Sequence, residues 1–205
     1  MTPNKCVQRI RAKRVSLTPV LELKTMDANE LLNLRSRTDS KMRYAKVHLD
    51  ELLQLKSHGG DDFDRAHQES FLFHFFGAKE SFLIELNTYY GANLPLAGLS
   101  PGKLRNKINE AGKQSLKLAE LFQLENDQTS WLFHAKEMRD HSTHVTGVAR
   151  AFHCGGPNDG QVWLKNPKTE KHIERHFTDE FSDWLQEMQN LLERLRSSAI
   201  ATNGL

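Results

Sequence analysis

The spacing of apolar residues predicts a chain built mainly of amphipathic helices. Between Asp27 and Ser57, apolar residues recur every three or four positions with charged residues between them, as the buried face of a helix requires. Residues 61–90 contain a second helical pattern that is apolar around most of its circumference, which is typical of the central helix of a bundle. Four aromatic residues of this pattern are expected in the core: Phe71, Phe73, Phe75 and Phe76.

Three more helical patterns follow. Ser100 and Pro101 are a favoured pair at a helix start, and a single apolar stripe continues from them to Phe122, which predicts one helix. Residues 131–144 contain the next helical pattern and residues 177–200 the last one.

The apolar period changes from 3.6 to 2 between the last two helical patterns. Residues 148–154 alternate in polarity, as do residues 162–164, and the glycine-rich segment 155–160 marks a turn between them. A weaker third strand is predicted at residues 172–176. The predicted fold is therefore mainly α, a bundle of four to five helices with a small β-hairpin inserted before the last helix.

Length and charge divide the chain into three regions. The 205 residues, 38% of them hydrophobic, are enough for one core. Residues 1–24 hold six Lys or Arg against one Glu, although the whole chain has a net charge of only +2. We predict a basic N-terminal arm at 1–26, a helical-bundle domain at 27–199 and a disordered tail at 200–205.

The basic arm has two interpretations. Its cations suit the phosphates of a nucleic acid, and the residues expected to contact them are Arg9, Arg11, Lys13 and Arg14. The alternative is a solvated terminus without a ligand.

The cysteines and the hydropathy pattern indicate a cytoplasmic protein. Cys6 and Cys154 lie far apart and form no CxxC motif, so neither a disulfide framework nor a zinc ribbon is expected. No segment approaches the ~20 consecutive apolar residues that span a bilayer, and no apolar run of signal-peptide length follows the basic start. We expect neither export nor membrane insertion.

Residues 138–144, "MRDHSTH", concentrate the candidate chemistry near the end of a predicted helix. Asp140 and His144 are four apart and share a helical face, so the carboxylate is placed to orient the imidazole. Arg139 and His144 are five apart, which rotates them by about 140° on a regular helix. They converge only if the helix ends here, and Gly147 predicts that it does.

The R-x(4–6)-H signature of the HEPN superfamily (higher eukaryotes and prokaryotes nucleotide-binding) is an arginine and a histidine separated by four to six residues, the first of which is polar. Part of the segment "MRDHSTH" resembles this signature. The matching residues are Arg139, Asp140 and His144. The resemblance implies an all-α bundle over residues 27–199. Many members of this superfamily are metal-independent endoribonucleases that act as dimers, and others are non-catalytic binding modules.

The resemblance therefore implies a homodimer that acts on RNA without a cofactor or metal ion. Arg139, Asp140 and His144 are the expected catalytic residues, and His141 is expected to assist nucleic-acid binding. In many members asparagine follows the arginine, so Asp140 departs from the pattern by placing a negative charge beside a phosphate site. Chance alone gives roughly two Arg–His pairs at these spacings, and the second pair here is Arg43 and His48 in the first helix.

Two other interpretations remain open. In the first, the chain is a non-enzymatic interaction protein, and its hairpin or its basic arm binds a protein partner. The residues "RDHSTH" then only end a helix, through contacts with the helix dipole and through ion pairs. A zinc site is less favoured, because no motif such as HExxH is present. The side chains considered for it are His141, His144, His153, Cys154, His172 and His176.

Overall fold

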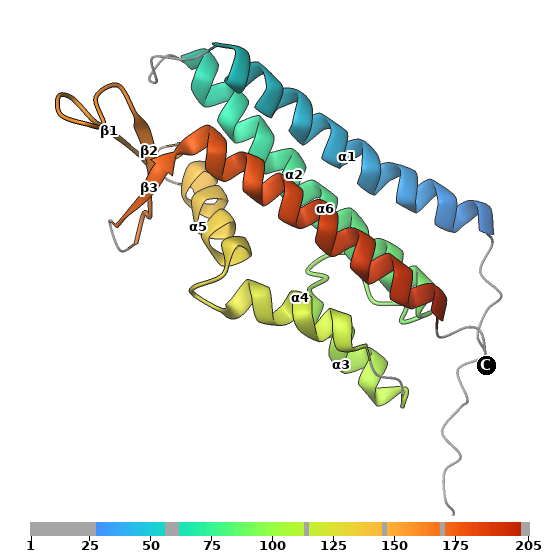
Figure 1. Ribbon diagram of the computed structural model, residues 1–205. Coiled ribbons are helices and arrows are strands. Elements are labelled where there is room, and N and C mark those ends of the chain that lie inside the picture. Colours follow the sequence, from blue (N-terminus) through green and yellow to red (C-terminus); the bar gives the residue numbers. More distant parts are fainter. Residues whose placement is uncertain (1–27, 56–61, 113–114, 145–146, 169–170, 202–205) are drawn as a thin grey trace, which may run out of the picture.

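Six helices and a small sheet form the fold of the computed structural model (Figure 1), which describes residues 28–55, 62–112, 115–144, 147–168 and 171–201. The predicted basic arm at 1–26 lies outside these ranges. The elements in chain order are α1 (Ala28–Leu55), α2 (Asp62–Tyr89), α3 (Pro101–Glu110), α4 (Leu116–Asn126), α5 (Trp131–His144), β1 (Arg150–Phe152), β2 (Val162–Lys165), β3 (His172–His176) and α6 (Phe177–Ala201). The predicted fold class, a mainly α bundle with a small sheet before the last helix, is confirmed. Helix α6 extends to Ala201, and residues 202–205 of the predicted tail lie outside the described ranges.

The long helices α1, α2 and α6 lie side by side, with α1 antiparallel to the other two (Figure 1). Their shared core is aromatic: the ring of Phe71 in α2 stacks on Phe181 in α6 at a centroid distance of 4.4 Å, and Trp184 is fully buried beside them. Burying each such ring contributes on the order of 2–3 kcal/mol. Among the described helices, none has the length and apolar character needed to cross a membrane.

The single helix predicted from Pro101 to Phe122 is wrong, because the structure divides it into α3 and α4. Gly112 has a φ of +71°, a conformation that ends a helix, and Ser115 starts the next one by accepting a hydrogen bond from the Leu118 amide at 3.2 Å. The apolar stripe continues across the break because Ile108 and Leu118 both face the core. The predicted start at Ser100 and Pro101 is confirmed, since the Ser100 hydroxyl accepts from the Lys103 amide.

The three strands form an antiparallel sheet in the order β1-β2-β3 at one end of the bundle (Figure 1). Ala151 pairs with Trp163 and Phe152 with Val162, which confirms the predicted hairpin and gives its register. Strand β3 confirms the weaker third strand. Because α5 leads into the sheet and α6 leaves it, the sheet connects the last two helices of the bundle.

A charged network joins α1, α2 and α6 inside this bundle. Arg196 of α6 donates to both carboxylate oxygens of Glu85, at 2.9 and 3.3 Å, and to Asp39 at 2.7 Å. Burial would lower the pKa of Arg196, but the hydrogen bonds to Glu85 and Asp39 outweigh it and raise the pKa. The side chain of Glu85 is only 3% exposed, so this carboxylate depends on Arg196 for compensation of its charge.

Candidate functional site

A groove of about 720 Å³ opens where α1, α2 and the last turn of α5 meet. It is lined by Arg37 and Lys41 from α1, by Glu69, Phe73, Phe76, Gly77, Glu80, Ser81 and Ile84 from α2, and by Arg139, Ser142, Thr143 and His144 from α5. Two of the three predicted catalytic residues, Arg139 and His144, therefore line the same groove.

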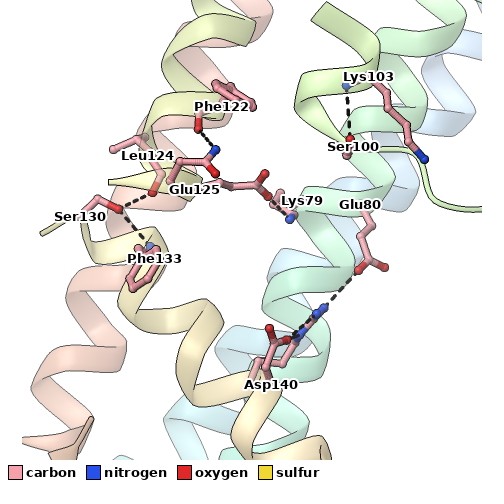
Figure 2. Close-up of polar contacts among 12 residues, drawn as sticks. Lys79, Glu80, Ser100, Lys103, Phe122, Leu124, Glu125, Ser130, Phe133 and Asp140 are labelled. Carbon is pink, nitrogen blue, oxygen red and sulfur yellow. Dashed lines mark hydrogen bonds and ion pairs between the residues drawn. The ribbon is translucent and has the colours of Figure 1, made fainter. Parts of the chain in front are cut away.

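The neighbouring helices determine where α5 starts. The Ser130 hydroxyl accepts a hydrogen bond from the Phe133 amide at 3.0 Å and donates one to the Leu124 carbonyl, which joins the end of α4 to the first turn of α5 (Figure 2). Lys79 of α2 forms an ion pair with Glu125 of α4 (Figure 2). These contacts fix the first turn of α5 against α2, and the helix then carries Arg139 to the groove.

Arg139 lies between two carboxylates. Its Nε and one terminal nitrogen donate to Asp140 Oδ1 at 3.0 and 2.8 Å, and its other terminal nitrogen donates to Glu80 Oε1 at 3.3 Å. The guanidinium also lies 4.9 Å from the centre of the buried Phe76 ring, a cation–π contact. The position of the cation is therefore well defined, but its charge is already compensated.

His144 is exposed at the edge of the groove, and its imidazole makes no hydrogen bond to any described residue. The predicted contact between Asp140 and His144 is not formed: Asp140 Oδ1 accepts from Arg139 instead. The Arg139 guanidinium, and not the His144 imidazole, binds the Asp140 carboxylate because it offers two N–H donors to one oxygen. The imidazole of His144 thus remains available to a ligand in the groove.

Helix α5 is described from Trp131 to His144 and includes both Arg139 and His144, and the chain has left the helix by Gly147, where φ is +89°. A Cβ at Gly147 would also lie only 3.2 Å from Glu69 Oε1, so glycine fits this position for two reasons. His141 does not line the groove. Its Nδ1 lies 2.9 Å from the Gly147 carbonyl, to which it donates, so its described role is to close the helix.

The walls from α1 and α2 were not identified from the sequence. Arg37 and Lys41, four residues apart on α1, bring two more cations to the groove, against the two anions Glu69 and Glu80. Phe73 was expected in the core, but its side chain is 65% exposed and its ring lies 5.0 Å from Lys41 Nζ. The groove therefore combines cations with an exposed aromatic ring.

No three His, Cys, Asp or Glu side chains within the described ranges are arranged to hold a metal ion. Of the histidines considered for zinc, His153 packs on the Trp163 ring at 3.9 Å and His176 lies 2.7 Å from the Thr178 hydroxyl. The structure brings neither of them to the groove.

The model of a family described as "Family of unknown function (DUF6586)" matches residues 32–201, a range that includes the whole groove. No curated protein and no solved structure matches the chain.

Proposed function

We propose that this chain, which belongs to the DUF6586 family of unknown function, is a HEPN-like protein that binds RNA in the groove and cleaves it without a metal ion. The observation that carries the proposal is the shared position of Arg139 and His144 on one groove together with Arg37 and Lys41. Three cations and an exposed phenyl ring suit the phosphates and bases of single-stranded RNA.

The proposed reaction is an attack of the ribose 2′-oxygen on the adjacent phosphorus. A base takes the 2′-OH proton, the P–O2′ bond forms, the P–O5′ bond breaks, and an acid protonates the leaving 5′-oxygen. The products are a 2′,3′-cyclic phosphate and a 5′-hydroxyl. His144 is the proposed base or acid, and Arg139 is proposed to compensate the charge that gathers on phosphorus. A second copy of the chain, paired through α5, would supply the other imidazole.

One experiment tests the reaction. The full-length protein is incubated with an RNA oligonucleotide in excess EDTA, and the ends of the products are identified by mass spectrometry. Cyclic phosphate ends are expected from RNA, and no cleavage is expected at a position that carries a 2′-deoxyribose. Intact RNA after prolonged incubation with folded protein would contradict the proposed cleavage.

A second function, RNA binding without cleavage, is favoured by one observation. Asp140 and Glu80 already hold the guanidinium of Arg139, so a phosphate has to compete with two carboxylates. Fluorescence anisotropy with the same RNA distinguishes the two functions, because binding without cyclic phosphate products identifies a binding module. An interaction protein without affinity for RNA would show neither signal.

Removing the charge of Asp140 is expected to strengthen RNA binding. The Asp140→Asn protein loses an ion pair whose carboxylate is 40% exposed, and an exposed pair of this kind contributes up to about 1 kcal/mol, which converts to about a two- to fivefold gain in affinity. Anisotropy titrations at two salt concentrations measure this gain. Asp183→Asn is the matched control, because Asp183 pairs with Arg175 outside the groove. An equal gain in the control would assign the effect to net charge alone.

A further inference from the structure

Helices α1 and α2 bring two imidazoles into contact on a face beyond the groove lining. The Nδ1 atoms of His48 and His67 lie 3.1 Å apart, and the ring centroids are separated by 5.1 Å. Neither residue lines the groove. His48 belongs to the second Arg–His pair of the sequence, but Arg43 bonds to Ser40 and takes no part in this contact.

The aromatic neighbours hold both rings. His48 stacks on His74 with an interplanar angle of 6° at 5.5 Å, and the edge of Tyr44 meets His74 at 5.3 Å. His67 packs against Phe63 at a centroid distance of 4.4 Å. The two nitrogens are therefore preorganised by ring packing rather than by their mutual contact alone.

We propose that His48 and His67 form a binding site for one divalent first-row transition-metal ion, such as Cu²⁺ or Zn²⁺, through their Nδ1 atoms. This inference is independent of the proposed action on RNA. Imidazole nitrogens are ligands that these ions prefer, and ligand distances of ~2.0–2.1 Å are usual.

The separation of the two nitrogens fits such an ion. Two ligands about 2.05 Å from a shared ion and 3.1 Å apart subtend about 98° at the metal, between octahedral and tetrahedral angles. No set of three ligating side chains is formed by the described residues, so water would complete the coordination. Binding requires both rings to present an Nδ1 lone pair, so the ring that donates the Nδ1–Nδ1 hydrogen bond moves its proton from Nδ1 to Nε2, and both rings then carry their single proton on Nε2.

Titration of the full chain with Cu²⁺ at pH 7 tests the site. Calorimetry is expected to give one ion per chain, and electron paramagnetic resonance is expected to show hyperfine coupling to two imidazole nitrogens. His48→Ala and His67→Ala are each expected to weaken the affinity by at least about 10–100-fold, the loss that follows removal of even an outer-shell partner. His153→Ala, which removes a hairpin histidine outside the pair, is expected to bind as the parent does.

Measuring the Tm with and without Cu²⁺ distinguishes a variant that has lost the metal site from one that is only less stable. Added Cu²⁺ is expected to raise the Tm of the parent and of the His153→Ala protein, but not that of the His67→Ala protein. Equal affinity in the parent and in either pair variant, or coupling to a single nitrogen, would overturn the site.

Discussion

Replacing His144 by alanine is expected to reduce the proposed cleavage of RNA in EDTA by about 10²–10⁴-fold, the usual contribution of a positioned general acid or base. The imidazole is exposed and bonds to no described residue, so its removal should change the free energy of unfolding by no more than about 0.5 kcal/mol. Arg37, Lys41 and Arg139 remain in the groove, and RNA binding should therefore persist. Single-turnover rates and anisotropy measure the two effects separately.

The His153→Ala protein is the control for this loss. It removes another histidine from the same domain, one that packs on Trp163 outside the groove, and should keep the parental rate. A His144→Ala protein that cleaves at the parental rate would show that His144 does not transfer the proton. A loss of binding together with cleavage would instead assign His144 to RNA contact.

Replacing Glu85 by alanine is expected to lower the free energy of unfolding by about 3–5 kcal/mol, because it leaves a largely buried guanidinium without its bidentate partner. The side chain of Arg196 is only 20% exposed and keeps a single bond, to Asp39. Urea unfolding followed by circular dichroism measures the change. It is one of the larger effects expected of a single substitution in this fold.

The same network supplies the control. Asp39 bonds to the same guanidinium, but its side chain is 47% exposed, so Asp39→Ala should cost at most about 1 kcal/mol. Replacing the buried pair together, Glu85→Leu with Arg196→Met, should be close to neutral, since no unpaired charge remains. If the Glu85→Ala and Asp39→Ala proteins lost similar amounts of unfolding free energy, this would contradict the conclusion that burial makes the Glu85 contact the more important one.

The elements with local signals were predicted well from the sequence. The C-terminal end of α5 and the start of α3 depend on Gly147 and on Ser100 with Pro101, whose effects reach only a few residues. The hairpin was visible because the period changed to 2 where α5 ends. The break between α3 and α4 was missed because the apolar stripe continues in phase across Gly112, although the glycine itself was a signal.

The position of Phe73 was also within reach of the sequence. On a helix, Phe71 and Phe75 are about 40° apart, whereas Phe73 lies about 200° from Phe71 and so points to the other side. The expectation that all four aromatic residues lie in the core does not take this rotation into account. The structure places Phe71 and Phe75 in the core and Phe73 on the groove.

Contacts between distant helices could not be predicted from local patterns. Which faces of α1 and α2 meet, and in which register, depends on the packing of the whole bundle. That register places Arg37 and Lys41 beside the last turn of α5 and sets His48 against His67. Likewise, only the folded chain shows that Glu80 reaches Arg139 and that Asp140 turns to the guanidinium instead of His144.

The groove has walls from three helices that are separated in the sequence, so it exists only while the bundle is assembled. Any molecule that occupies it binds the native state alone and shifts the folding equilibrium by mass action. A compound present at a hundred times its Kd would add about 2.7 kcal/mol, or roughly 5–10 °C in Tm for a domain of this size. A melting-temperature screen of nucleotides and metabolites would thus identify the natural occupant without assuming any reaction.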